Sequence, residues 1–192
     1  MIKRCILASA LSALALAPTL AHAQADPTMS RPGLLQAGVA ISKISPDLVS
    51  QDITGITGYA TFDVTPRLGA ELSIHLGSVI TPNDVAEDSF SIGPRYVYRI
   101  KDRYEPYAKV LFGIAKTVAQ EPYVTASNPY GIPGTFGFVG FGAGLDIRVP
   151  HNITVRAIDL EYQDWYTWKP HGLSPVIYSI GASYRFDSIF GK

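Results

Sequence analysis

Apolar residues alternate with small or polar residues along the last strand-like segment of the chain, residues 178–186. Because the side chains of a β-strand point to opposite faces in turn, this segment has one apolar face and one face of small, polar and charged residues. The apolar face consists of Tyr178, Ile180, Ala182, Tyr184 and Phe186. The pattern is typical of a strand that presents one face to lipid, but it also occurs in soluble sandwiches, so both environments stay open at this point.

The same alternation recurs in seven earlier segments, so the sequence predicts eight strands. They cover residues 34–44, 53–64, 68–76, 89–100, 104–115, 136–149, 153–165 and 178–186. No stretch after Pro27 approaches about 18 consecutive apolar residues, so no helical membrane span is expected there. Only 17% of the residues are charged, against roughly 25% in an average soluble domain. Such a chain must distribute its apolar residues by alternation.

The connections between these strands alternate in length. The three short ones are residues 65–67, 101–103 and 150–152, and the four longer ones are residues 45–52, 77–88, 116–135 and 166–174. Short turns at one rim and long loops at the other are typical of outer-membrane barrels, in which the short turns face the periplasm. Lipid offers no hydrogen-bond partners to an open sheet edge, so the sheet must close. We therefore predict an all-β, eight-stranded antiparallel up-and-down transmembrane β-barrel over residues 34–186, located in the outer membrane.

The N-terminus has the features of a cleaved signal peptide over residues 1–23. Lys3 and Arg4 precede an apolar core at residues 6–20, and Ala21-His22-Ala23 provides small residues at the cleavage site. An uncleaved anchor is the alternative, although the core is short for a span and contains Pro18. Cleavage leaves residues 24–33 as an N-terminal periplasmic segment, and residues 187–192 form a short tail. The only cysteine, Cys5, leaves with the signal, so disulfides are not expected.

Charged residues recur on the inward faces of the predicted strands. An eight-stranded barrel is too narrow for a water-filled channel, and a buried unpaired charge costs several kcal/mol. We therefore predict a packed interior charge network rather than a pore, with a narrow proton or ion path as the alternative. Its members are Glu71, Arg95, Arg99, Lys109, Asp159, Glu161 and Arg185. Arg156 has outward parity but lies near a turn, where its side chain is expected to snorkel toward water.

Several short patterns, taken in order, resemble those of a known family. They are the run at residues 57–69, Gly-Pro-Arg-Tyr at residues 93–96, Glu-Pro-Tyr at residues 105–107, the glycines of residues 140–144 and the closing Tyr-Arg-Phe at residues 184–186. The chain resembles the small eight-stranded outer-membrane barrels typified by the membrane domain of OmpA and by OmpX. The resemblance does not extend to the peptidoglycan-binding domain of longer relatives.

This resemblance implies contact with outer-membrane lipid and lipopolysaccharide, and insertion by the barrel assembly machinery. In this family the machinery reads a terminal strand that ends in an aromatic residue, so Tyr184 and Phe186 are the expected terminal-strand signal. The tail leaves open whether the signal ends at Phe186 or, at the same parity, at Phe190.

No catalytic, cofactor or metal site is predicted, and the chain is not expected to be an enzyme. His75 and Ser78 lie close in sequence, but strand parity sends them to opposite faces. No His or Cys pair has metal-ligand spacing. Without the signal the chain has 14 basic and 16 acidic residues, which gives no indication of nucleic-acid binding.

The expected role is therefore structural, with extracellular loops available for surface interaction or adhesion to a partner that the sequence does not identify. The loop at residues 116–135 contains two tyrosines and three prolines, and it either binds a partner or merely shields the barrel mouth. Trp165, Tyr166 and Trp168 are interpreted as an aromatic girdle at the membrane interface. The alternative is a soluble periplasmic or secreted lipocalin-like ligand-binding barrel, in which every face would be inverted.

Overall fold

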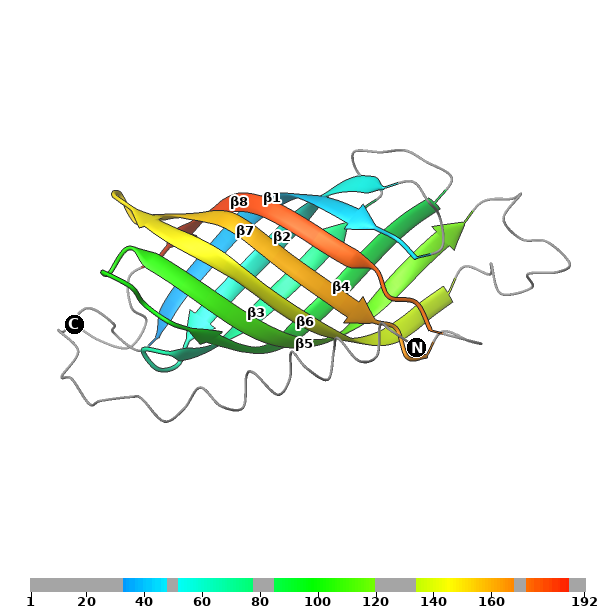
Figure 1. The fold of residues 1–192 in the computed structure, drawn as a ribbon, viewed down its shortest axis with the longest axis horizontal. Helices are drawn as coiled ribbons and strands as arrows, with labels where there is room; N and C mark the ends of the chain where they lie inside the picture. Colours follow the sequence, from blue (N-terminus) through cyan, green and yellow to red (C-terminus); the bar gives the residue numbers. More distant parts are fainter. Residues whose placement is uncertain (1–32, 48–51, 78–84, 120–133, 168–171, 187–192) are drawn as a thin grey trace, which may run out of the picture.

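Eight antiparallel strands close into one barrel in a computed structural model that describes residues 33–47, 52–77, 85–119, 134–167 and 172–186 (Figure 1). Each strand pairs with the next along the chain, and β8 pairs with β1. The strands are β1 (Leu34–Ser45), β2 (Ile53–Asp63), β3 (Leu68–Leu76), β4 (Val85–Val97), β5 (Tyr104–Ala119), β6 (Gly134–Val149), β7 (Ile153–Asp164) and β8 (Val176–Arg185). This order confirms the predicted up-and-down barrel.

Several predicted features fall beyond the described residues. These are the signal peptide at residues 1–23, nearly all of the segment at residues 24–33, the tail at residues 187–192, Trp168 and Phe190. Within the described ranges, no helix is long and apolar enough to cross a membrane.

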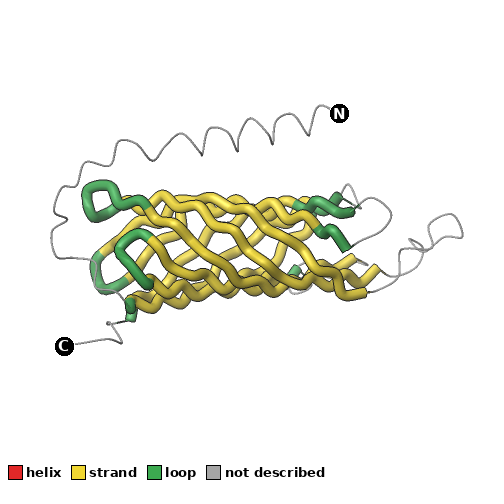
Figure 2. Tube along the Cα trace, turned by 90° about the horizontal axis from the view of Figure 1, so that it is seen from below, coloured by secondary structure: helices red, strands yellow, loops and turns green. Residues whose placement is uncertain are grey.

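Figure 2 shows the strands tilted around the barrel, with short turns at one end. Two of these turns place residues in the left-handed region: Lys101 and Asp102 at φ 51° and 52°, and His151 and Asn152 at φ 64° and 60°. Such backbone matches the right-handed twist of the flanking strands, and Asp, Asn and His tolerate it better than most residues. In the third turn the hydroxyl of Thr65 accepts a hydrogen bond from the amide of Leu68 at 2.9 Å. The three turns thus fix the strand register.

The β4–β5 hairpin is longer than predicted. It begins at Val85 rather than near Ser89, and it ends at Ala119 rather than near Ala115, with Val85 opposite Ala119. The apolar alternation stops at Glu87 and Asp88, but the backbone ladder continues past these charged residues. Pairing needs only main-chain groups, so a strand can outlast its amphipathic pattern.

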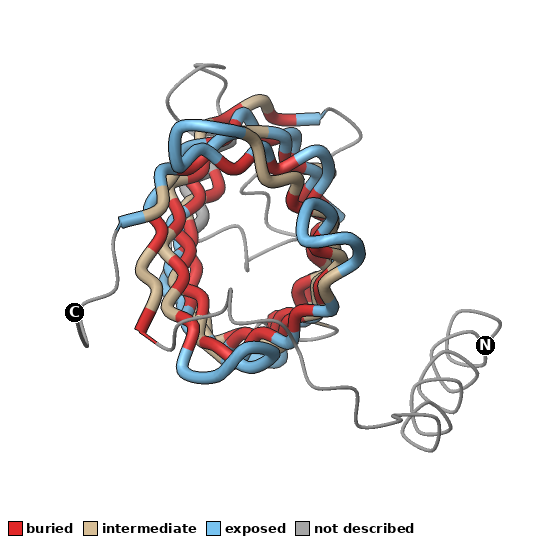
Figure 3. The backbone as a smooth tube through the Cα atoms, turned by 90° about the vertical axis from the view of Figure 1, so that its left-hand side faces the viewer, coloured by how far each residue is buried: buried red, intermediate tan, exposed pale blue. Residues whose placement is uncertain are grey.

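The two faces of the wall differ as the alternation predicts. Val39, Ile41 and Ile180 are 60–65% exposed on the outside, whereas Glu71, Arg95 and Lys109 are at most 3% exposed inside. A view down the axis shows buried and exposed positions alternating around the ring (Figure 3). A soluble barrel requires polar residues outside and apolar residues inside, so the lipocalin-like alternative is wrong.

One strand departs from simple alternation. Between β6 and β7, Leu145 pairs with Ile158 and the next residue, Asp146, pairs with Arg156, so Ala157 is an extra residue in β7. A bulge of this kind places two consecutive residues on the same face. Ala157 and Ile158 both face outward, and Arg156 faces inward at 1% exposure. The prediction that Arg156 points outward and snorkels is therefore wrong, because the bulge reverses the parity of every residue before Ala157.

The barrel interior as candidate functional site

Glu71 on β3 lies at the centre of a set of ion pairs inside the barrel. Its carboxylate lies 2.8 Å from Nζ of Lys109 and 2.9 Å from Nη2 of Arg156, and Nε of Arg95 lies 3.6 Å away. These three cations come from β5, β7 and β4, so the contacts of one carboxylate join strands on several sides of the lumen. The Glu71 side chain is fully buried.

The cations around Glu71 have further acidic partners. Lys109 Nζ lies 2.9 Å from Asp159 Oδ2 and 3.1 Å from Glu161 Oε2. Asp146 accepts from Arg95 Nη2 at 2.5 Å and from Arg156 Nε at 3.2 Å. Removing charges from water costs several kcal/mol per ion, and only close opposite charges with good hydrogen-bond geometry offset that cost. Most of these ions contact more than one opposite charge, so removing any single member leaves buried partners with fewer counter-charges.

Two tyrosines flank the arginines. The guanidinium carbon of Arg156 lies 3.7 Å from the ring centroid of Tyr59, and that of Arg95 lies 4.0 Å from the ring of Tyr107. Cations over aromatic faces at this range gain about 0.5–2 kcal/mol, more where water is excluded. The rings thus fill space beside the ion pairs while remaining electrostatically favourable.

Glycines make room for these long side chains. A Cβ at Gly142 would lie 2.5 Å from Cε of Lys109, and a Cβ at Gly93 would overlap the main-chain oxygen of Val110. By contrast, a Cβ at Gly58, on the outward parity of β2, would meet nothing within 4 Å. The inward glycines therefore belong to the packing of the interior and are no phosphate-binding loop.

A second ionic cluster lies at the short-turn end. Arg99 contacts Asp63 at 3.0 Å and Glu105 at 2.6 Å, and Arg148 Nη2 lies 2.6 Å from the same Glu105 oxygen. Arg99, predicted in one network with Glu71, thus pairs in this separate cluster. Arg185 does not join Glu71, Asp159 or Glu161 either; its guanidinium donates to the carbonyl of Val149 at 3.3 Å. The parity of both residues is inward, but their height along the barrel sets different partners.

A row of hydroxyl groups and one imidazole lies between the central ion pairs and the long-loop end. Ser179 donates to Ser42, which contacts Thr57, and Thr57 Oγ1 lies 2.7 Å from Nδ1 of His75. His75 Nε2 in turn lies 3.5 Å from Glu161. This order of hydroxyl, imidazole and carboxylate looks like a hydrolytic triad, but Thr57, His75 and Glu161 are each about 1% exposed. Ser78, the hydroxyl considered with His75, lies outside the described residues.

Apolar side chains cover the ionic interior at the long-loop end. Trp165 is 1% exposed, stacks on Phe136 and Phe138 at centroid distances of 6.2 and 6.5 Å, and donates through Nε1 to Gln163 at 2.8 Å. Ala115 and Leu173 complete this cluster, and Ile44, Ile53 and Ile177 form a second one. The assignment of Trp165 to a lipid-facing girdle is therefore wrong. The parity of Glu161 and Gln163, both inward, could have identified its direction.

The exposed aromatic residues lie mainly elsewhere. Tyr166 is 63% exposed at the long-loop end, as a girdle residue would be. At the short-turn end Tyr98, Tyr104, Tyr184 and Phe186 are 38–55% exposed, and the rings of Tyr184 and Phe186 meet edge to face at 5.2 Å. Such aromatic bands mark the membrane interface in barrels. Sequence analysis missed this row because its members are dispersed over three strand ends.

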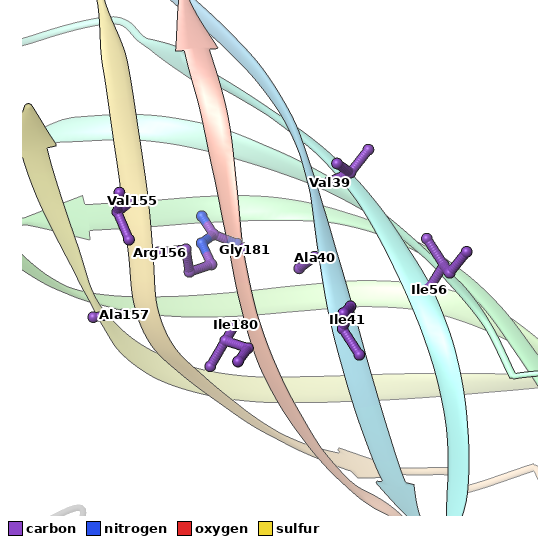
Figure 4. A pocket seen from close by; sticks show the side chains of 9 residues that line it. All are labelled: Val39, Ala40, Ile41, Ile56, Val155, Arg156, Ala157, Ile180 and Gly181. Carbon is purple, nitrogen blue, oxygen red and sulfur yellow. The ribbon is translucent and has the colours of Figure 1, made fainter. Parts of the chain in front are cut away.

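An apolar groove lies on the outer wall beside the bulge. A groove of about 590 Å³ crosses β7, β8, β1 and β2, and Ala157, Gly181 and Ala40 form its small-residue part (Figure 4). Val39, Ile41 and Ile180 border it with apolar side chains. An apolar groove on a lipid-facing wall suits a hydrocarbon chain better than a polar substrate.

Several charged or titratable interior residues were absent from the predicted network, among them Asp63, Glu105, Asp146, Arg148, Arg156 and His75. Asp146 has inward parity in β6, which is a sufficient signal, whereas Arg156 has none because of the bulge. In the part of the chain that the structure describes, no group of three or more His, Cys, Asp or Glu residues is arranged to hold a metal ion.

Comparison with known proteins agrees with this architecture. The NspA surface protein of Neisseria is 16% identical, with a TM-score of 0.58 over 80% of this chain and 96% of that one. The N-terminal barrel of Pseudomonas aeruginosa OprF is 13% identical, with a TM-score of 0.57 over 81% of this chain and 98% of that one. P. aeruginosa OprG is 11% identical, with a TM-score of 0.57 over 81% and 97%. At these identities the likeness concerns the fold.

Family membership rests on the sequence itself. No curated protein sequence matches the chain. The family model described as the outer membrane protein beta-barrel domain matches residues 6–186, which is nearly the whole sequence. The closed eight-stranded wall, with apolar residues outside and charged residues inside, is the architecture that this match requires. The chain therefore belongs to the outer-membrane β-barrel family.

Proposed function

We propose that this protein is a structural barrel of the outer membrane whose interior is closed to ions and solutes. The observation that carries the proposal is the set of contacts around Glu71, whose carboxylate has cations from β4, β5 and β7 within 3.6 Å. An eight-stranded barrel has an interior just wide enough for side chains to fill. We infer that ion pairs at this spacing exclude a continuous file of water between the strands that they join.

Two apolar clusters support the same function. Trp165 and Phe138 on one side, and Ile44 and Ile177 on the other, lie at the long-loop end above the ionic interior. An apolar constriction opposes the passage of ions even where a little space exists, because it dewets. The interior thus combines ion pairs at its middle with apolar side chains at one end. We propose no enzymatic role for the protein.

Conductance across a planar bilayer tests the closed interior. The purified, refolded protein is expected to give no single-channel currents at either polarity, while a water-filled porin in the same bilayer conducts. Steady currents from the wild-type barrel that persist at neutral pH would contradict the proposal. Heat-modifiable migration on a gel checks in each preparation that the barrel is folded.

A second proposal concerns export and insertion. We propose that residues 1–23 are removed as a signal peptide and that the barrel assembly machinery reads Tyr184 and Phe186 at the end of β8. In the folded barrel both side chains are about half exposed on the lipid-facing side and contact each other, as an aromatic terminal-strand signal would. Replacing Phe186 with Ala is expected to lower assembly in cells more than replacing Phe190, and equal losses would place the signal elsewhere.

The long-loop end is the proposed contact surface toward the cell exterior, where the barrel also meets lipopolysaccharide. Residues 120–133, which connect β5 to β6, contain Tyr123, Tyr130 and three prolines, a composition that suits aromatic contacts at modest entropic cost. Shortening this loop and assaying the binding of intact cells to host surfaces tests an adhesive role. Protease digestion of intact cells, cleaving in this loop and sparing the turns at residues 65–67 and 101–103, tests the orientation.

A further inference from the structure

Charge is distributed unevenly between the two ends of the barrel. Among the described residues, the short-turn end has six cations, which are Arg67, Arg99, Lys101, Arg103, Arg148 and Arg185. Its three carboxylates are Asp63, Asp102 and Glu105. The long-loop end has two cations, Lys43 and Lys116, and five carboxylates, Asp47, Asp52, Glu87, Asp88 and Asp164. The formal balance is therefore +3 at one end and −3 at the other.

Position divides five of the six cations of the short-turn end into two groups, and the sixth, Arg185, donates to the carbonyl of Val149. Arg99 and Arg148 are partly buried and contact Asp63 and Glu105 inside the barrel. Arg67, Lys101 and Arg103 are exposed and lie in the turns at residues 65–67 and 101–103. The inner group thus contacts the buried carboxylates, whereas the outer group is exposed at the rim together with Asp102, which gives the exposed turns a formal charge of +2.

The exposed aromatic row lies beside this rim. Tyr98 and Tyr104 flank the turn that contains Lys101 and Arg103, and the guanidinium of Arg103 lies 5.9 Å from the ring centroid of Tyr104. Tyrosines exposed on the outside of a barrel sit at the level of the lipid headgroups. Lys101 and Arg103, in the turn between these two tyrosines, therefore lie at the level of the lipid phosphates.

We propose that this basic rim, formed by Arg67, Lys101 and Arg103, binds the anionic headgroups of phospholipids in the periplasmic leaflet. Guanidinium groups bind phosphate oxygens in a fork geometry, and the lysine adds a compact positive charge. Basic residues beside a membrane surface gain favourable energy from anionic lipid, and the gain decays within a Debye length. The choice of leaflet rests on the proposed orientation, with the short turns in the periplasm.

The charges at the long-loop end differ from those of the basic rim. There Lys43 lies 2.8 Å from Asp52, and this contact holds the pKa of the Asp52 carboxyl below its ordinary value. The remaining described charges at that end are mainly carboxylates, so no comparable set of exposed cations lies there among the described residues. The described residues therefore favour an anionic phospholipid headgroup at the short-turn end.

Spin-labelled lipids test this inference directly. The folded protein is placed in bilayers of phosphatidylcholine that contain a trace of spin-labelled phosphatidylglycerol or spin-labelled phosphatidylcholine, and the fraction of immobilised label is measured. The wild type is expected to immobilise the anionic label preferentially at low salt. The triple variant Arg67→Gln, Lys101→Gln, Arg103→Gln is expected to bind the two labels equally, and 1 M salt is expected to abolish the wild-type preference because the Debye length falls to about 3 Å.

Matched variants separate the rim from charge in general. The pair Lys43→Gln and Lys116→Gln removes exposed cations from the opposite end and is expected to leave the preference unchanged. Arg67→Lys with Arg103→Lys keeps the charge and is expected to keep the preference. Equal association of both labels with the wild type, or an equal loss in the Lys43 and Lys116 variant, would overturn the inference. Conductance and loop proteolysis are independent readouts, so its failure is distinguishable from failure of the proposed function.

Discussion

Arg156 and Glu71 face each other across the barrel interior as a two-pronged ion pair. Nη2 of Arg156 lies 2.9 Å from Oε2 of Glu71, and Nη1 lies 3.3 Å from Oε1, although the two residues are 85 positions apart in the sequence. The pair exists because the extra residue Ala157 turns Arg156 inward. A single bulge in β7 thus supplies the arginine on which the proposed closure of the interior depends.

Removing the arginine is expected to destabilise the barrel strongly. Arg156→Met leaves Glu71 and Asp146 with fewer cations, and breaking a buried pair from one side costs about 3–5 kcal/mol. The free energy of unfolding, measured by guanidinium titration in lipid vesicles, is expected to fall by that amount. In vesicles of phosphatidylcholine alone, which carry no anionic headgroup for the basic rim, Arg103→Gln removes an exposed arginine as the matched control and is expected to change this free energy by less than about 0.5 kcal/mol.

Deleting Ala157 tests the bulge itself. Without the extra residue, Arg156 and Asp159 are two positions apart, so a strictly alternating β7 keeps both side chains inward. We therefore expect the deletion variant to retain a folded, heat-modifiable fraction close to that of the wild type. Deleting the outward residue Leu160 is the matched control, because it moves Asp159 or Glu161 to the lipid face, and it is expected to lower the folded fraction strongly. An equal loss in the two deletion variants would show that Ala157 is not a dispensable bulge residue.

The direction of Trp165 is open to a fluorescence test. In the variant Trp168→Phe, the only remaining tryptophan is Trp165, which packs on Phe138 inside the barrel. Brominated acyl chains quench a tryptophan only on close approach, so weak quenching is expected. A Tyr166→Trp variant that lacks both native tryptophans places the indole at the exposed neighbouring position and is expected to be quenched strongly. Comparable quenching in the two variants would indicate that Trp165 faces lipid.

Two glycines provide a matched pair for the packing of the interior. A methyl group at Gly93 would overlap the carbonyl oxygen of Val110, which cannot move without disturbing β5, whereas one at Gly58 would meet nothing within 4 Å. Gly93→Ala is expected to lower the free energy of unfolding by about 1–3 kcal/mol. Gly58→Ala is expected to be neutral or to raise it by a few tenths of a kcal/mol. Equal effects would mean that the inner wall has spare room.

Much of the fold could be read from alternation alone. Once one face of a strand is assigned, alternation assigns the other. The residues that face outward as predicted include Phe112, Phe141 and Tyr184, and those that face inward include Glu71, Arg95 and Lys109. The bulge could not be read, since Ala157 and Ile158 are both apolar and suit either parity. Its consequence, the inward Arg156, was therefore missed.

Partner choice was also beyond the sequence. Parity says that Arg99 and Arg185 face inward, but the stagger of tilted strands decides their height and hence which carboxylate each one meets. Arg99 reaches Asp63 and Glu105 near the turns, far along the strands from the level of Glu71. For Trp165, parity alone was sufficient to predict an inward side chain. Its residue type suggested the wrong face, because tryptophan is common at membrane interfaces.

A double-mutant cycle between Glu71 and Arg156 tests the account most directly. The free energy of unfolding in lipid vesicles is measured for the wild type, Glu71→Gln, Arg156→Met and the double variant, each refolded to a heat-modifiable barrel. If the bulge brings the two side chains together across the lumen, the double variant is expected to lose less than the sum of the single losses, with a coupling energy of about 2 kcal/mol. Additive losses would contradict the central claim that this ion pair braces a closed interior.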